Sequence, residues 1–566
     1  MSGAEIIAKV LKKAGVRRVF VFPGGTIAPL IDALIKEKIE LFCAINEQGA
    51  GYAAIGAAKT SGETQVVIVT SGPGATNVLT PVADAYYDSV PLLVLTGQVG
   101  TGSINYKKKV RQTGFQETDT VGIFKSITKK SFILTFSDNI SKAIASAFEY
   151  TITSRPGPVL IDLPMDVQKS ENKYYPIKSE RIELTQDVRI RTFREFNKYI
   201  STAKRPLILS GNGVNISQTH KYLRMFAEKF NIPVVSTLPG VGAMPSNHPL
   251  YFSFVGHTGE YFANLAMYYS DLLIVFGARL DLRQTGSEIE HFKISKKIIR
   301  VDIDESEIKF GRVKADLNFN NDLFEFFKSY FKKSYKIKAK TIDWIKKINY
   351  WKKKFHSSQF FKIYSLSSYD IIRSVDKITK YKNVIVSSGV GSHQQYVPRF
   401  FTFNHPRRIW MTSAGHGTMG FDIPAIVGAV LEKKNTVGIV FVGDGSFQMN
   451  IQELATIKEK NLPIKIFVMD NKRLGIVSQF QLLTLGSDPT TGDKKNPSFS
   501  KIAEAYGLRN YEIYKKAEIN SIVEKMFSDM SPALVHCHID PCEDVLPMLL
   551  AGQKLNEMYP FKGEVS

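Results

Sequence analysis

Short apolar runs alternate with amphipathic segments along most of the chain. The runs have the length of buried strands and end near Gly, Pro, Ser or Asp, as in VFVFP (19–23), QVVIVTS (65–71), DLLIVFG (271–277) and VGIVFV (437–442). The segments between them have a helix-like pattern. Repeated alternation of strand and helix predicts an α/β fold made of doubly wound parallel sheets.

The alternation divides into three segments, which we predict to be three similar domains covering residues 1–168, 185–335 and 360–566. Residues 169–184 are charged and poor in structural signals, so they are predicted to be a linker. A Lys-rich connector precedes the third segment. Further strands are predicted at LFCAIN (41–46), PLLVLTGQV (91–99), LILSGNG (207–213), IPVVSTL (232–238), KIIRVDID (297–304) and within VIVSSGVGSHQQ (384–395).

Length and composition fit this division. A chain of 566 residues suggests three or four domains, and a hydrophobic content of 44% is ample for their cores. The net charge of +21 raises the possibility of nucleic-acid binding. We reject it because the lysines are dispersed, and the densest clusters (328–340 and 345–355) fall in the connector and on a predicted surface helix. Such a positive surface can help to attract anionic substrates.

The cellular location predicted from the sequence is the cytoplasm. The three cysteines, Cys43, Cys537 and Cys542, match no zinc spacing and cannot form a disulfide framework. Nothing resembles a signal or transit peptide, and no apolar run is long enough to span a membrane.

One segment carries the clearest chemistry. The apolar run before Gly443 ends in the turn Gly443-Asp444-Gly445, and a second apolar run ends at Asp470-Asn471. The spacing suits one βαβ unit, so both strand ends should lie side by side at the carboxyl edge of a parallel sheet. Oxygen ligands there suit Mg²⁺ bridging to a diphosphate. The alternative is a buried strand turn that holds no metal.

This segment resembles the thiamine diphosphate (ThDP) binding motif. The longer stretch SFQMNIQELATIKEKNLPIKIFVMDNKRLGIVSQFQ (446–481) is similar to the catalytic subunit of acetolactate synthase (acetohydroxyacid synthase), and the resemblance covers nearly the full chain. It implies a pyrimidine-binding domain, a central FAD-type domain and a diphosphate-binding domain, in that order.

The resemblance assigns the metal and diphosphate residues. It implies that Asp444, Asn471 and the Arg473 carbonyl bind Mg²⁺, and that Met419 supports the bent cofactor. A structural histidine or a plain core methionine is the alternative for His393 and Met419. The other residues that it places at the diphosphate half of ThDP are Val390, Gly391, Ser392, His393, Gly417, Gly445, Ser446, Gly475 and Ile476.

Glu47 is the predicted catalytic carboxyl. It lies just past a strand and opens a small-residue helix in AINEQGAGYAA, where partial desolvation would raise its pKa and suit proton exchange. Without its flanking motif, Glu47 would be interpreted as an acidic residue at a helix N-terminus, where it interacts favourably with the helix dipole. Its match to the family's NEQGAGHAA-like motif implies that it holds the pyrimidine N1′ so that the cofactor's own imino group removes the C2 proton. In this family the glutamate and the GDG turn come from different subunits, which implies at least a homodimer.

Other matches surround this carboxyl. SGPGATN, with Pro73 and Asn77, would line the pyrimidine side, and Gly25 in the PGG turn would leave room for substrate. In Phe115-Gln116-Glu117, which matches the family's FQE, Gln116 would donate to an intermediate's oxygen and Phe115 would contact substrate.

The central segment carries an FAD signal. GARLDLRQTG (277–286) resembles the GARFDDRVTG of FAD-containing members, although Leu282 replaces an Asp and FVGHTG (254–259) matches only partly. The predicted FAD residues are Gly211, Gly213, Thr237, Leu238, Gly277, Arg279, Asp281, Arg283 and Asp302. FAD would be structural, because carboligation has no net redox change; the alternative is a degenerate domain that binds nothing.

Departures from the family concentrate near the acceptor side. Phe480 replaces the tryptophan that selects the acceptor keto acid, and Thr26 replaces a common Ala. The main prediction is a carboligase that decarboxylates pyruvate and transfers the two-carbon unit to a second 2-keto acid, giving 2-acetolactate for branched-chain amino acid biosynthesis. Alternatives are transfer to a nucleotide-linked ketosugar and a pyruvate oxidase-type flavoenzyme. A homodimer or homotetramer is expected, and a regulatory small subunit is possible.

Overall fold

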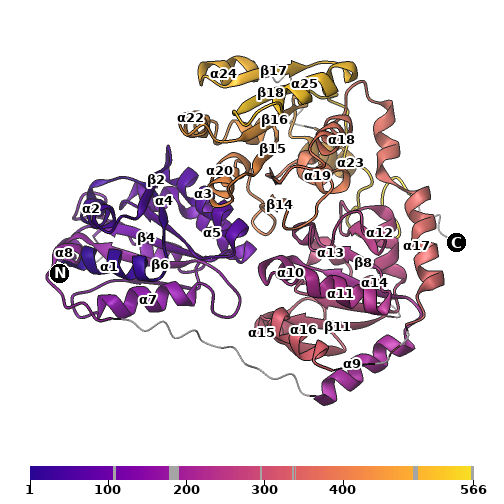
Figure 1. Ribbon diagram of the computed structural model, residues 1–566, viewed down its shortest axis with the longest axis horizontal. Helices are drawn as coiled ribbons and strands as arrows, with labels where there is room; N and C mark the ends of the chain where they lie inside the picture. The colour runs from indigo at the N-terminus through magenta and orange to yellow at the C-terminus, as the bar shows by residue number, and fades with distance from the viewer. Residues whose placement is uncertain are drawn as a thin grey trace.

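The structure is a computed structural model that describes residues 1–105, 110–176, 190–293, 296–333, 335, 337, 339–488 and 495–561. It contains three six-stranded sheets in which all described strand pairs are parallel, and each sheet is covered by helices on both faces (Figure 1). The predicted fold class is therefore confirmed.

The N-terminal sheet has the strand order β2-β1-β3-β4-β6-β5. Its strands are β1 (Arg18–Phe22), β2 (Glu40–Cys43), β3 (Gln65–Val69), β4 (Leu92–Gln98), β5 (Lys130–Ile133) and β6 (Val159–Pro164). One face packs against α1 (Gly3–Lys13), α2 (Ala28–Lys36), α7 (Ile140–Tyr150) and α8 (Met165–Lys169). The other face packs against α3 (Glu47–Ser61), α4 (Pro73–Asn77), α5 (Leu79–Asp88) and α6 (Thr120–Phe124).

The central sheet has the order β12-β11-β10-β7-β8-β9. Its strands are β7 (Pro206–Ser210), β8 (Val234–Ser236), β9 (Tyr251–Phe254), β10 (Leu272–Phe276), β11 (Lys297–Asp302) and β12 (Leu317–Asn320). An aromatic-rich core lies under α9 (Ile190–Thr202), α11 (His220–Phe230) and α16 (Leu323–Phe331). The opposite face packs against α12 (Tyr261–Tyr269) and α17 (Ile342–Lys354). The short helices are α10 (Asn212–Ile216), α13 (Leu282–Thr285), α14 (Ile289–Lys293) and α15 (Glu305–Phe310).

The C-terminal sheet has the order β14-β13-β15-β16-β18-β17. Its strands are β13 (Val384–Ser388), β14 (Arg408–Thr412), β15 (Val437–Gly443), β16 (Ile464–Asp470), β17 (Arg509–Ile513) and β18 (Ala533–His538). One face packs against α18 (Ser368–Ile378), α19 (Ser392–Phe400) and α25 (Ile519–Met526). The other packs against α20 (Asp422–Glu432), α22 (Glu453–Glu459) and α24 (Phe499–Ala505). Two further helices, α21 (Asp444–Phe447) and α23 (Gly475–Leu485), begin at the carboxyl edge.

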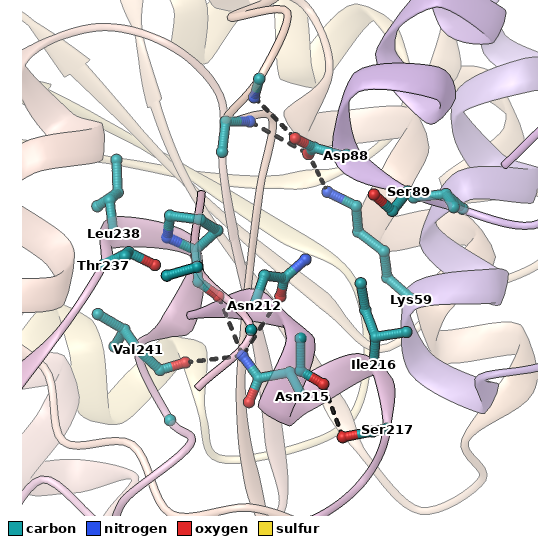
Figure 2. Close-up of a pocket in the computed structure, with 18 of the residues that line it drawn as sticks. Lys59, Asp88, Ser89, Asn212, Asn215, Ile216, Ser217, Thr237, Leu238 and Val241 are labelled. Atoms are coloured by element: carbon teal, nitrogen blue, oxygen red, sulfur yellow. Dashed lines mark hydrogen bonds and ion pairs between the residues drawn. The ribbon is translucent and has the colours of Figure 1, made fainter. Parts of the chain in front are cut away.

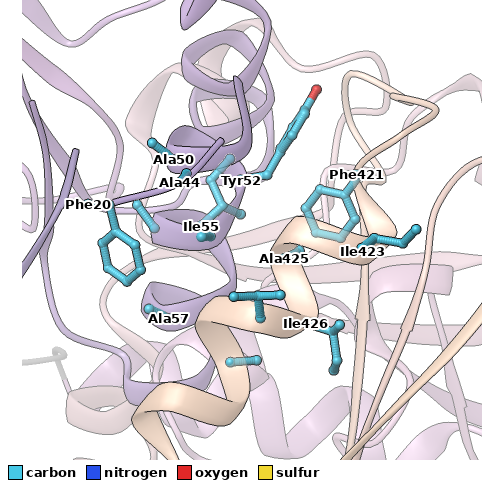
Figure 3. Packing of buried hydrophobic residues seen from close by; sticks show 14 of the residues in the cluster. Phe20, Ala44, Ala50, Tyr52, Ile55, Ala57, Phe421, Ile423, Ala425 and Ile426 are labelled. Carbon is cyan, nitrogen blue, oxygen red and sulfur yellow. The ribbon is translucent and has the colours of Figure 1, made fainter. Parts of the chain in front are cut away.

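The N- and C-terminal domains share one hydrophobic core, because α3 crosses α20 at close range (Figure 3). A Cβ added to Gly56 would lie 1.8 Å from the Ala425 carbonyl oxygen, and one added to Gly428 would lie 1.7 Å from the Ala53 oxygen. Only glycine fits at either position. This crossing fixes the first turn of α3, where Glu47 lies, against the C-terminal domain.

The strands predicted from apolar runs are present, with ends shifted by a few residues. The strands that the pattern did not predict include the sheet-edge strands β5, β9, β12, β14 and β17. The predicted linker follows α8, and residues 177–189, which include its end and the predicted start of the second domain, lie outside the described residues. Among the described residues, no helix has both the length and the apolar character needed to cross a membrane.

Candidate functional site

The two strand ends predicted to meet do lie side by side. Strands β15 and β16 pair in parallel with Gly443 opposite Met469, which brings Asp444 next to Asp470 at the carboxyl edge. Asp444 is buried (2% exposed), and its carboxylate accepts hydrogen bonds from Gly445 N at 2.9 Å and Asn496 Nδ2 at 2.6 Å. The predicted βαβ unit is thus confirmed, although its helix is interrupted between α21 and α22.

Asn471 lies close to Ser392, the first residue of α19. A Cβ added to Gly475 would lie 2.6 Å from Ser392 Oγ and 2.8 Å from Asn471 Nδ2, so these three predicted residues adjoin one another. The Arg473 side chain points toward the C-terminal segment and donates to Asp544 Oδ1 at 2.7 Å. Because the side chain is engaged in this contact, only the backbone carbonyl of Arg473 is left for the Mg²⁺ contact predicted from the sequence.

His393 is buried under the diphosphate-side turns. Its ring adjoins both Gly391 and Gly443, since a Cβ on either glycine would lie 2.5 Å or 3.1 Å from His393 Cε1. Burial lowers the pKa of His393 to about 3, which keeps the ring neutral at physiological pH. Its Nε2 is buried without a hydrogen-bond partner among the described residues, as expected of a group that faces an external ligand.

Met419 lies over the GDG turn, with its Cε 3.2 Å from the position of a Cβ on Gly445. Gly417, two residues earlier, has φ +77°, a conformation that favours glycine. A buried network anchors this loop, because Ser446 Oγ accepts from Gly420 N at 2.8 Å and donates to Asp422 Oδ2 at 2.9 Å.

Asp422 is a site residue that the sequence analysis missed. It is fully buried, also accepts from Gly389 N at 3.0 Å, and thereby ties the turn after β13 to the turn after β15. Burial raises its pKa to about 6. In the sequence it lies three residues after the predicted Met419, in GFDIP (420–424). Asn496, which bonds both Asp444 and Asp470, had no sequence signal at all.

Glu47 begins α3 in the N-terminal domain. The Asn46 side chain caps the helix by accepting from Gly49 N at 2.7 Å, as N-terminal asparagines do. Glu47 is 8% exposed, and its Oε2 accepts from Asn77 Nδ2 at 2.7 Å. A Cβ on Gly74 would lie 3.2 Å from Glu47 Oε1, so the predicted SGPGATN segment does form a wall of this carboxyl.

Three predicted turns meet beside this wall. Thr26 Oγ1 lies 2.8 Å from Thr70 Oγ1 and accepts from Ser71 N at 3.0 Å, so the departure from Ala joins the PGG turn to SGPGATN. A Cβ on Gly72 would lie 2.8 Å from Gln116 Cβ. Gly25, by contrast, has nothing within 4 Å of its added Cβ, which agrees with open space at that turn.

Two predicted substrate residues are exposed on this chain. Phe115 is 85% exposed at the tip of its loop, and Phe480 is 51% exposed on α23. The loop around Phe115 is held by the buried Glu117, whose carboxylate accepts from Thr113 N at 2.6 Å. Neighbouring apolar side chains on or near α23 are exposed as well, namely Leu474, Val477, Leu482 and Leu485.

The structure does not place Glu47 in the same hydrogen-bonded group as Asp444. The start of α3 and the residue before its N-cap meet residues beyond the GDG turn instead. Asn450 Nδ2 donates to Gln48 Oε1 at 3.1 Å, and Ile45 N donates to Glu453 Oε1 at 3.2 Å. The residues predicted to line the pyrimidine and those predicted to bind the metal therefore form two separate hydrogen-bonded groups on one chain.

A cavity of about 500 Å³ lies where the three domains meet (Figure 2). Of the predicted FAD residues, its lining includes Gly213, Thr237, Leu238, Gly277, Arg279, Asp281, Arg283 and Asp302. The N-terminal domain contributes Lys59 and Asp88, and Lys59 Nζ bonds to Asp88 within the wall. The volume is in the range of cofactor sites.

The glycines of this cavity are in mutual contact. A Cβ on Gly211 would lie 2.0 Å from Gly277 O, and one on Gly213 would lie 2.7 Å from Gly277 Cα. Gly211 is thus a packing residue behind the cavity rather than part of its lining. Arg279 pairs with Asp281 at 3.0 Å, while burial raises the pKa of Asp302 to about 6.

Family models match three parts of the chain. Residues 1–123 match the N-terminal TPP binding domain of thiamine pyrophosphate enzymes, residues 193–328 their central domain, and residues 389–537 their C-terminal TPP binding domain. The chain belongs to the thiamine pyrophosphate enzyme family.

Full-length relatives narrow this class. The chain is 36% identical to the acetolactate synthase large subunit of Buchnera aphidicola (subsp. Schizaphis graminum), with 100% of both chains covered. It is 37% identical to that of Lactococcus lactis, covering 98% of this chain and 96% of the relative. It is 34% identical to acetolactate synthase 1 of Zea mays, covering 98% and 88%. The predicted resemblance to acetolactate synthase and the ThDP-dependent carboligase class are confirmed, and the ketosugar and oxidase alternatives gain no support.

Proposed function

We propose that this chain is the catalytic subunit of an acetolactate synthase. It would decarboxylate pyruvate and transfer the two-carbon unit to a second 2-keto acid, with 2-acetolactate as the product when that acceptor is pyruvate. The observation that carries the proposal is the pair of adjoining strand ends bearing Asp444 and Asn471, within a chain similar to such subunits over its full length.

The diphosphate half of ThDP would lie at the carboxyl edge of the C-terminal sheet. Mg²⁺ would be held by Asp444, Asn471 and the Arg473 carbonyl, a set of hard oxygen ligands. Asn496 would orient the Asp444 carboxylate for the metal, since the Asn496 amide donates a hydrogen bond to one of its oxygens. The other proposed contacts are Val390, Gly391, Ser392, His393, Gly417, Met419, Gly445, Ser446, Gly475 and Ile476.

Bound ThDP supplies the electron sink that decarboxylation requires. Glu47 would hold the pyrimidine N1′, and its Asn77 contact at 2.7 Å fixes the carboxyl orientation. Pro73 and Asn77 would line the pyrimidine. Gln116 would donate to substrate oxygen, Gly25 would leave space for substrate, and Phe115 and Phe480 would cover it.

FAD would occupy the cavity between the three domains. Its phosphates would lie against the contact between Gly213 and Gly277, where no Cβ could be accommodated. They would pair with the guanidinium groups of Arg279 and Arg283. Asp302, at the end of β11, would accept a hydrogen bond from a ribose hydroxyl, as acidic residues do in dinucleotide sites.

The active site would be completed by a second copy of the chain. Glu47 and Asp444 are in separate groups, and both Phe115 and the apolar side of α23 are exposed, as expected of surfaces covered in an assembly. We propose a homodimer or homotetramer, located in the cytoplasm. Because the relatives are named large subunits, we also propose association with a regulatory small subunit. The domain boundaries 1–168, 185–335 and 360–566 are part of this proposal.

The test is 2-acetolactate formation from pyruvate alone, with ThDP, Mg²⁺ and FAD supplied. We expect activity in the wild type and a loss of at least about 100-fold in Glu47→Gln, as removal of a catalytic proton-transfer group produces. ThDP binding, followed by fluorescence titration, should change little. Glu63→Gln, an exposed glutamate in the same domain, is the matched control and should retain full activity.

Two results would contradict the proposal. CO₂ release from pyruvate without 2-acetolactate would show that another acceptor is used. Normal turnover of Glu47→Gln would show that this carboxyl is not the catalytic group.

A further inference from the structure

A second group of metal-ligand residues lies on the C-terminal sheet, beside the proposed Mg²⁺ site. Asp470 ends β16, and His536 and His538 are at alternate positions of the neighbouring strand β18. Because side chains alternate along a strand, the two imidazoles point to one face, and the pairing of Asp470 with His538 adds the carboxylate to that face. Cys537, between them, faces the opposite core.

The donor atoms are close together. Asp470 Oδ2 lies 2.8 Å from His536 Nε2, and one ligand atom from each of Asp470, His536 and His538 lies within 4.8 Å of the others. The two imidazole rings have centroids 4.0 Å apart. A dication with bonds of about 2.0–2.2 Å to nitrogen and oxygen needs ligand atoms that lie this close together. The side chains would have to rotate only slightly to bind it.

A second carboxylate, from Glu512, adjoins this group as a fourth candidate ligand. Glu512 pairs with His536 across β17 and β18, and its Oε2 lies 3.5 Å from His538 Nε2. That nitrogen has no hydrogen-bond partner among the described residues. The cluster thus offers two imidazoles, one buried carboxylate and one partly exposed carboxylate.

We propose that Asp470, His536 and His538, with Glu512 as the fourth ligand, form a binding site for a transition-metal dication such as Zn²⁺. Imidazole nitrogens select Zn²⁺ and similar ions, whereas Mg²⁺ prefers oxygen ligands. The site is therefore chemically distinct from the oxygen set at Asp444.

The surroundings hold the ligands in place, as in protein metal sites. Asp470 Oδ1 accepts from Asn496 Nδ2 at 2.7 Å and from Lys472 N at 3.1 Å, which leaves Oδ2 directed to the cluster. Ser500 and Tyr514 donate to the two oxygens of Glu512.

The site also adjoins the cofactor machinery. Asn496 bridges Asp470 and Asp444, so one amide connects the proposed dication site to the proposed Mg²⁺ ligand. A metal on Asp470 would fix this bridge. The competing interpretation is a metal-free aspartate–histidine pair with a purely structural role.

The test uses the full-length protein, with the exposed thiols of Cys43 and Cys542 alkylated so that they bind no metal. After treatment with a chelator, the protein is saturated with ThDP and Mg²⁺ and then titrated with Zn²⁺ by calorimetry and with Co²⁺ by visible absorption. We expect one equivalent to bind, and His538→Gln and Asp470→Asn to weaken binding at least about 10-fold.

His248→Gln is the matched control, because His248 is a partly exposed histidine that also contacts a carboxylate, Glu228 at 3.1 Å. It should bind Zn²⁺ and Co²⁺ like the wild type. Asp444→Asn should lose Mg²⁺–ThDP binding but keep the Zn²⁺ site, which separates this proposal from the function proposed above. Absence of stoichiometric binding, or equal binding by His538→Gln, would establish the metal-free pair instead.

Discussion

The crossing of α3 and α20 is the most sensitive packing contact that the structure offers for a test. We predict that Gly56→Ala destabilises the protein although alanine favours helix over glycine. The added Cβ would lie 1.8 Å from the Ala425 carbonyl oxygen, and backbone atoms cannot rotate away. Ordinary contact begins at 3.4 Å, so the two helices must separate by about 1.6 Å.

The size of the effect follows from what that separation disturbs. The two helices share a fully buried core that includes Tyr52, Ile55, Phe421 and Ile426 (Figure 3). A gap of about 1 Å already removes up to about half of a dispersion contact. Overpacking of this kind costs roughly 3 kcal/mol, and the higher helix propensity of alanine returns about 1 kcal/mol. The expected net loss is about 2 kcal/mol.

The assay is thermal unfolding of wild type and variants at one ThDP concentration, since ligand binding itself shifts the transition. A loss of about 2 kcal/mol corresponds to a melting temperature lower by about 4–8 °C for a domain of this size. Gly428→Ala, whose Cβ would lie 1.7 Å from Ala53 O, should behave alike. The double variant should lose less stability than the two single variants together, because one separation of the helices relieves both clashes.

Gly102→Ala serves as the control, because its added Cβ meets nothing within 4 Å. It should melt at the wild-type temperature or slightly above. If Gly56→Ala and Gly428→Ala both match this control, the helices are not in rigid contact and the reasoning from the glycine pair is wrong.

Two further outcomes are expected. Gly211→Ala would place a Cβ 2.0 Å from Gly277 O. It should lower the FAD retained after gel filtration at least about 10-fold, as measured by flavin fluorescence. Unchanged retention would contradict the proposal that FAD binds in this cavity. Asp422 has a pKa raised from 3.8 to about 6, so its ionisation destabilises the fold as pH rises through that interval. In Asp422→Asn this decline in stability with pH should be absent. If the melting temperatures of both proteins change in the same way between pH 4 and 7, the assignment of this pKa to Asp422 is wrong.

Much of the site was readable from local sequence. The GDG turn, the NEQGAG helix start and the SGPGATN segment are each continuous stretches, and the structure places each at a strand end. Their spacing encodes strand, turn and helix directly, because buried strands end where glycine and polar residues begin. The short edge strands β5, β9 and β12 were not predicted, since each has only four residues and is too short to form a clear apolar run.

The sequence by itself determined the fold class and the family, because the strand, turn and helix spacing that defines them is short-range. Only the tertiary structure showed that Asp422 and Asn496 contact the turns after β13 and β15, and that His536 and His538 join Asp470 across 66 residues of chain. It also showed that α3 and α20 form one core between two domains. The physical reason is strand order: β18 inserts between β16 and β17, and contacts across strands depend on that order, which local patterns do not encode.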